Sequence, residues 1–155
     1  ELYLENFNWL ISQYDKLKST LEEIDTASIL SVDNANNSSI TSEMVAYAYD
    51  VSKKVFEGKL GRTEGRDEIA DRVNMNSGSA GDYISAFYAM MNGERYTRTL
   101  NEYSTRYFLK AIYEDYGELA LKKAIDACRK HATYYAALGR GRLAYVEKIV
   151  EEYSN

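Results

Sequence analysis

Apolar residues recur at three- and four-residue spacing along most of this chain, and no proline interrupts the pattern. Proline breaks helices because it removes a backbone hydrogen-bond donor. It makes up about 5% of average proteins, so its absence from 155 residues is unusual. No segment shows the sustained alternation that indicates a half-buried strand. The sequence therefore predicts an all-α fold, a single multihelical domain of about six or seven helices.

Turn-forming residues divide this pattern into separate helices. Gly58, Gly93 and Gly117 stand where helices are expected to end, because glycine readily adopts the left-handed conformation there. The series Thr99-Leu100-Asn101-Glu102 matches the capping-box pattern and predicts a helix start. We expect helices over residues 41–57, 63–73, 77–93, 99–116, 118–138 and 143–153, with a turn at 139–142.

Residues 1–30 are expected to form a separate amphipathic helix. Its apolar positions follow a heptad-like seam that either packs on the rest of the domain or joins two copies in a homodimer. Residues 31–39 are rich in turn formers and predict a linker. Residues 41–155 are then expected to form the main helical domain. Because the chain begins with Glu1 rather than Met, we also expect that this sequence is a piece of a longer protein.

The segment from Thr63 to Gly93 has the pattern of two helices joined by a tight turn. Asn74-Met75-Asn76 interrupts the helical spacing, with Met75 expected to be buried inside the turn. Ser77 or Ser79 would cap the second helix by accepting a backbone N–H that has no partner in the helix. The pattern is that of a helix-turn-helix-like unit, whose second helix can enter the major groove of DNA. The alternative is a helical hairpin without a role in DNA binding.

Charge is unevenly distributed along the chain. The net charge of −5 weighs against general nucleic-acid binding, but residues 1–50 alone carry −7. The segment between Asn92 and Arg142 contains ten Lys and Arg residues and six acidic residues, so its net charge is +4. Specific contact with phosphates needs a local positive face rather than a basic protein.

Basic and aromatic residues that follow the helix-turn-helix-like segment are the main candidates for DNA contact. Arginine binds phosphate or guanine through two hydrogen bonds, and tyrosine stacks on bases. The alternative is a solvated basic face over a tyrosine-rich core. The candidates in this region are Arg95, Tyr96, Arg98, Arg106, His131, Arg140 and Arg142. At the start of the second helix, Ser77, Ser79, Asp82 and Tyr83 are expected to probe the groove.

Little in the sequence indicates an enzyme. One cysteine and one histidine cannot supply the four ligands of a zinc cage. Phosphate-binding loops and hydrolase motifs are missing, so we expect no cofactor or metal. Cys128 and His131 could form a nucleophile and its base, but Cys128 lies on an apolar helical stripe and is expected to behave as a small buried hydrophobe. The sequence shows no apolar run long enough for a membrane span and no signal peptide, so we expect a cytoplasmic protein.

Several short motifs also carry a resemblance. They are Met75-Asn76, Ser79-Ala80, Asp82-Tyr83-Ile84, Met91, Gly93, Tyr96-Thr97-Arg98-Thr99, Tyr107-Phe108-Leu109, Tyr116-Gly117 and His131 with Tyr134-Tyr135. Over residues 41–135 the chain resembles a helical module that accompanies HNH-type, modification-dependent restriction endonucleases. The resemblance implies a module that precedes a nuclease domain and reads DNA, in some members through a phosphorothioate sulfur. It also implies that Tyr96, Arg98 and His131 lie near the DNA.

These observations together predict a non-catalytic domain at residues 41–155 that binds double-stranded DNA. Its expected role is the targeting module of a modification-dependent restriction nuclease, with phosphorothioate DNA as one form of the target. The prediction depends on the candidate arginines gathering beside the Ser77–Asp82 helix start as one positive surface. The rival interpretation is a helical protein–protein interaction domain whose contact is the acidic first helix.

Overall fold

The structure is a computed structural model that describes residues 8–19 and 39–154. The chain divides into two compact units, Glu1–Asn37 and Ser38–Asn155. All regular structure in the described ranges is helical, which confirms the all-α prediction. In the first unit, residues 8–19 form a helix, and the remainder of the helix expected within residues 1–30 lies outside the described residues.

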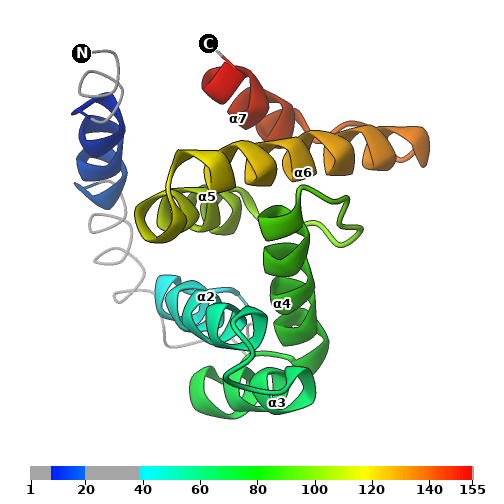
Figure 1. The fold of residues 1–155 in the computed structure, drawn as a ribbon. Coiled ribbons are helices and arrows are strands. Elements are labelled where there is room, and N and C mark those ends of the chain that lie inside the picture. The colour runs from blue at the N-terminus through cyan, green and yellow to red at the C-terminus, as the bar shows by residue number, and fades with distance from the viewer. Residues whose placement is uncertain (1–7, 20–38, 155) are drawn as a thin grey trace, which may run out of the picture. The chain divides into compact units, whose positions relative to one another are not determined.

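Six helices of the second unit follow the order expected from the apolar spacing (Figure 1). Their ends differ from the expected ends by a few residues, and Gly93 and Gly117 lie at the ends of α4 and α5 as predicted. The helices are α2 Ser42–Phe56, α3 Arg62–Val73, α4 Ser77–Asn92, α5 Glu102–Tyr116, α6 Glu118–Ala137 and α7 Ala144–Ser154.

Two predicted helix caps are wrong, and asparagine takes both places. Asn76 precedes α4, and its side-chain oxygen accepts from the backbone N–H groups of Gly78 and Ser79. Ser77 is instead the first residue of the helix. Asn101 caps α5 by accepting from the N–H of Ser104 at 2.8 Å. Asparagine and serine are similarly good caps, so composition alone did not decide between neighbouring candidates.

The α2, α3 and α4 helices pack against one another in pairs. Between α3 and α4 the chain turns in three residues, with Asn74 in the left-handed conformation and Met75 buried. Gly65 of α3 allows the close approach of α2, because a Cβ atom there would lie 2.6 Å from a methyl group of Val55. This packing fixes the start of α3 beside the outer face of α4.

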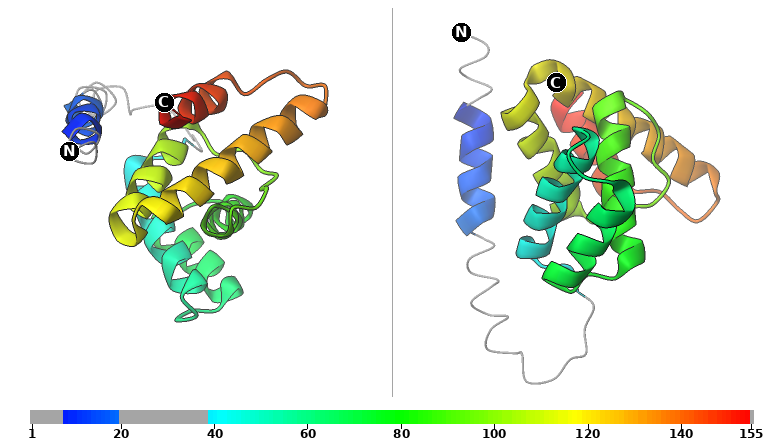
Figure 2. Two further views of the ribbon diagram at one scale, coloured as in Figure 1. Left: turned by 45° about the horizontal axis from the view of Figure 1, so that its top comes forward. Right: turned by 60° about the horizontal axis from the view of Figure 1, so that its bottom comes forward.

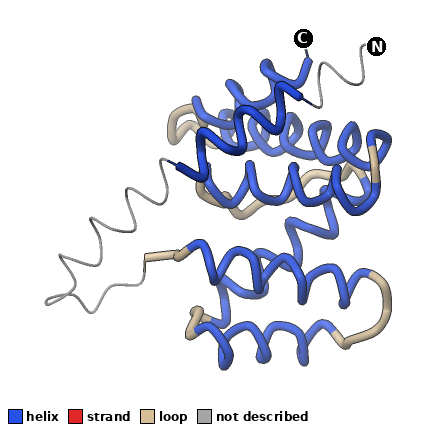
Figure 3. The backbone as a smooth tube through the Cα atoms, turned by 90° about the vertical axis from the view of Figure 1, so that its left-hand side faces the viewer, coloured by secondary structure: helices blue, strands red, loops and turns tan. Residues whose placement is uncertain are grey.

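A second layer consists of α5, α6 and α7 (Figure 3). The α4 helix links the two layers, since it packs on α2 and α3 and is also crossed by α6 (Figure 1 and Figure 2). Aromatic rings fill the join: Tyr49, Phe87 and Phe108 meet edge to face, with centroid separations of 5.4 to 6.2 Å. Such contacts stabilise the core beyond the burial of apolar area.

Candidate nucleic-acid interface

An open depression of about 450 Å³ lies on the outer face of α4. Asp82, Ser85, Ala86 and Ala89 of α4 share one helix face because they are three or four residues apart, and their small side chains leave the depression open. The remaining wall comes from the start of α3 and from the connector between α4 and α5. The depression is also lined by Tyr88 of α4, by Arg62 of α3 and by the connector residues Glu94, Arg95, Tyr96, Thr97 and Arg98.

The connector at residues 93–101 is held in place from beneath by Tyr96 and His131. The two rings stack with centroids 4.2 Å apart and an interplanar angle of 17°. The Nδ1 of His131 donates to the backbone carbonyl of Tyr96 at 2.7 Å, and its Nε2 lies 3.0 Å from the hydroxyl of Thr99. A buried ring with both nitrogens bonded in this way holds the connector at Tyr96 and at Thr99.

Burial contradicts three of the sequence predictions. Tyr83, Tyr96 and His131 were expected to contact DNA, but they are only 4%, 5% and 0% exposed. The Tyr83 hydroxyl pairs with Ser104 at 2.6 Å inside the core. Burial lowers the pKa of His131, so the neutral ring is favoured. Tyr83 stands at helical spacing from buried Ala80 and Phe87 on α4, and this spacing is a sequence signal for its place in the core.

Arginines on both sides of Tyr96 line the depression. The Arg95 guanidinium lies 4.5 Å from the ring centroid of Tyr134 on α6, a cation–π contact that leaves its hydrogen-bond donors available. Arg98 is exposed and close enough to Asp82 to lower the pKa of that carboxyl. Burial is the larger effect on Asp82, and its pKa is raised overall.

Arg62 completes the cationic group from the other side. It is the first residue of α3, and its guanidinium donates to the hydroxyl of Ser85 on α4. Among the residues that the structure describes, no carboxylate forms an ion pair with Arg62, Arg95 or Arg98. Within the described part of the chain, their positive charges are therefore not neutralised by direct pairing.

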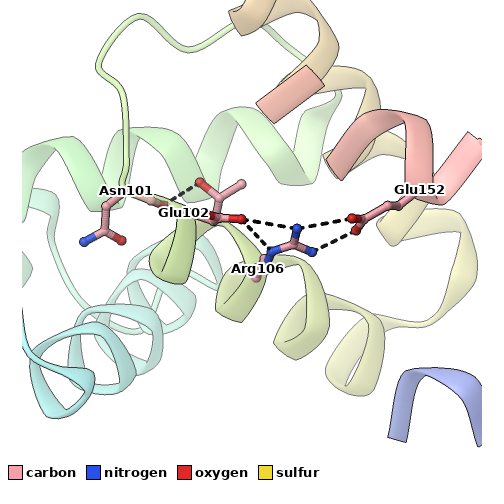
Figure 4. Close-up of polar contacts among 5 residues, drawn as sticks. Asn101, Glu102, Arg106 and Glu152 are labelled. Atoms are coloured by element: carbon pink, nitrogen blue, oxygen red, sulfur yellow. Dashed lines mark hydrogen bonds and ion pairs between the residues drawn. The ribbon is translucent and has the colours of Figure 1, made fainter. Parts of the chain in front are cut away.

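Other predicted arginines do not join this group, so the expectation of one continuous positive surface is wrong. Arg106 forms ion pairs with Glu102 and with Glu152, at 3.3 and 2.9 Å, and ties α5 to α7 (Figure 4). Arg142 pairs with Glu147 at 3.0 Å and lines a second depression between α6 and α7. Arg140 lies in the exposed turn between these helices.

The start of α4 lies beside Arg66, which sequence reasoning did not select. A Cβ atom built at Gly81 would lie 3.8 Å from Cδ of Arg66. Ser77 is exposed and Ser79 is partly exposed at this end of the helix. Arg62 and Arg66, one helical turn apart on α3, were also missed. Tyr88 was missed as well. It stands outside the series Ile84, Phe87 and Met91 that helical spacing places in the core, and this position is a sequence signal for an exposed ring.

A cysteine nucleophile is not supported by the geometry. Cys128 is fully buried, and burial raises the pKa of its thiol to about 11. The Tyr96 hydroxyl donates to its sulfur at 3.5 Å. Both ring nitrogens of His131 are engaged elsewhere. Reactive cysteines need a low pKa and access to solvent, and Cys128 has neither.

No protein-family model matches this chain, and no curated protein or solved structure matches it either. Within residues 8–19 and 39–154, no three His, Cys, Asp or Glu side chains gather as a metal site. None of the helices in those two ranges combines the length and the apolar content that crossing a bilayer requires.

Proposed function

We propose that residues 41–155 form a non-catalytic domain that binds double-stranded DNA. The observation that carries the proposal is that Arg62, Arg95 and Arg98 line one depression on α4, and that none of them forms an ion pair with a carboxylate of the described residues. Guanidinium groups that have no carboxylate partner are the usual ligands of backbone phosphates. A partly buried Asp82 and a nearby Glu94 temper the local charge, which favours a few directed contacts over broad electrostatic attraction.

In this proposal the connector and the start of α3 set the position of the duplex. Arg95 and Arg98 hold phosphates on one side of α4, and Arg62 holds them on the other. The exposed end of α4 at Ser77 and Ser79 then meets the groove, where small side chains permit close approach. Phosphate contacts fix the register, and contacts from the helix start read the bases.

We further propose that the domain targets a modification-dependent restriction nuclease to its DNA. The support is the resemblance described above, because Arg98 belongs to the Tyr96-Thr97-Arg98-Thr99 motif and lies on the candidate surface. Methylated or phosphorothioate DNA is the corresponding target. Buried Tyr96 and His131 act in this scheme by positioning the connector.

Fluorescence anisotropy with a labelled duplex tests the proposal, at NaCl concentrations from 50 to 200 mM. Three phosphate contacts give a slope of log K against log salt of about −2.7, or a loss of affinity of about 40-fold over this range. Arg98→Ala should weaken binding and reduce the steepness of the slope by about 0.9. Arg129→Ala is the matched control, because Arg129 pairs with Asp126 and lines the other depression.

Equal losses in Arg98→Ala and Arg129→Ala would show that the depression is not the DNA site. No binding to the duplex at any of these salt concentrations would instead favour the helical protein–protein interaction domain. Plain, methylated and phosphorothioate duplexes should be compared in the same titration. Equal affinity for all three would remove the modification from the proposal and leave the DNA site intact.

A further inference from the structure

The depression on α4 is small compared with a DNA duplex. The connector forms one wall at Arg95 and Arg98, and Arg62 forms the opposite wall. A volume of about 450 Å³ is in the range of sites that bind small molecules. A DNA duplex that rests on the three arginines would therefore lie over the opening, with space beneath it for a single chemical group.

An exposed aromatic ring lines this space. Tyr88 is 45% exposed although it belongs to a helix whose other large side chains are buried. The ring of Phe56 contacts it edge to face, at 5.1 Å between centroids and 73° between planes, and supports it from the protein side. A ring supported on one side and open on the other is a platform on which a nucleobase can stack.

The acidic residues in the depression also need an explanation, because carboxylates repel phosphates. Asp82 of α4 and Glu94 of the connector line the depression together with the three arginines. A carboxylate accepts hydrogen bonds from the amino groups of cytosine and other bases. Three guanidinium groups, two carboxylates and one open ring together match a nucleotide better than a bare phosphate.

We propose that the depression holds one nucleotide unstacked from the bound DNA, with its base on Tyr88 and its phosphates between Arg95 and Arg98. The inference rests on the proposed DNA-binding function. Extruding a base from a duplex costs free energy, and the cost is least where the base is already unpaired. The domain should therefore prefer DNA that contains an unpaired nucleotide over the same fully paired sequence.

Anisotropy titrations of the full chain with three duplexes test this inference. One is fully paired, one carries a single bulged cytosine, and one carries a bulged abasic site. The bulged cytosine should bind about 10-fold more tightly than the other two, since base–aromatic stacking is of that order. Tyr88→Phe should keep this preference. Tyr88→Leu, which retains an apolar contact with Phe56, should reduce the ratio to about 1.

Two results would overturn the inference. If the abasic bulge binds as tightly as the bulged cytosine, the preference reflects DNA flexibility and not a seated base. If Tyr88→Leu melts like the wild type and keeps the full preference, Tyr88 is not the platform. In both cases salt-dependent binding of the paired duplex would persist, so the proposed function would stand. If the wild type binds none of the three duplexes, the proposed function itself is wrong.

Discussion

Replacing Gly65 by alanine tests the packing that sets α3 against α2 and α4. A Cβ atom at this position would lie 2.6 Å from Cγ2 of Val55, 3.2 Å from Cγ1 of Val51 and 3.6 Å from Cδ1 of Ile84. The first distance is far inside van der Waals contact. Alanine is the better helix former by about 1 kcal/mol, so helix propensity alone predicts that Gly65→Ala stabilises the protein. We expect the opposite.

The magnitude follows from the neighbours. Both valines lie on α2, and a β-branched side chain in a helix has one strongly preferred rotamer, so neither methyl group can move away at low cost. Relief requires α2 and α3 to separate. Overpacking of this kind costs about 1–3 kcal/mol. The 2.6 Å approach places this substitution in the upper part of that range, at about 2–3 kcal/mol. After subtracting the gain in propensity of about 1 kcal/mol, we expect a net loss of about 1–2 kcal/mol and a fall in Tm of about 4–10 °C.

Gly81 provides the matched control on the neighbouring helix. A Cβ atom there would meet only Cδ and Cγ of Arg66, at 3.8 and 4.0 Å, which are ordinary contacts. Gly81→Ala should therefore stabilise the protein by about 0.5–1 kcal/mol. Urea unfolding of both variants, followed by circular dichroism, measures the two signs. A Gly65→Ala variant as stable as Gly81→Ala would refute the close approach of α2 and α3.

Three further outcomes follow from single contacts. Asn76→Ala should lower the free energy of unfolding by about 1 kcal/mol through loss of the α4 cap, whereas Ser77→Ala should change it by less than about 0.5 kcal/mol; urea unfolding separates the two. His131 has its pKa lowered by burial, so the unfolded chain takes up a proton first and stability should fall as pH drops below about 6.5, by at most about 1.4 kcal/mol per pH unit. The fall should end below the lowered pKa, and His131→Gln should remove it from unfolding curves collected between pH 5 and 7. Arg106→Ala should cost about 1–2 kcal/mol, and a double-mutant cycle with Glu152→Ala should show coupling between them, which additive losses would contradict.

The helices were predictable because local forces determine them. Apolar spacing identified the buried faces of α2 to α7, and glycines marked the ends of α4 and α5. The candidate surface was less predictable, because it depends on contacts between distant parts of the chain. Arg106 and Glu152 are 46 residues apart, and no local pattern shows that they pair. Arg62 was missed for the same reason, since only the packing of α3 brings it to Ser85.

The most distinctive residues of the connector are not the ones that we propose to contact DNA. Exposed Arg95 and Arg98 flank a tyrosine that is buried on His131, so the motif combines an anchor with the groups that the anchor positions. Ordering the backbone of one residue costs about 1–2 kcal/mol. A connector that is already ordered in the free protein does not incur that cost when it binds. If the proposed function holds, substituting the anchor should therefore weaken DNA binding indirectly, whereas substituting either arginine should remove a proposed contact.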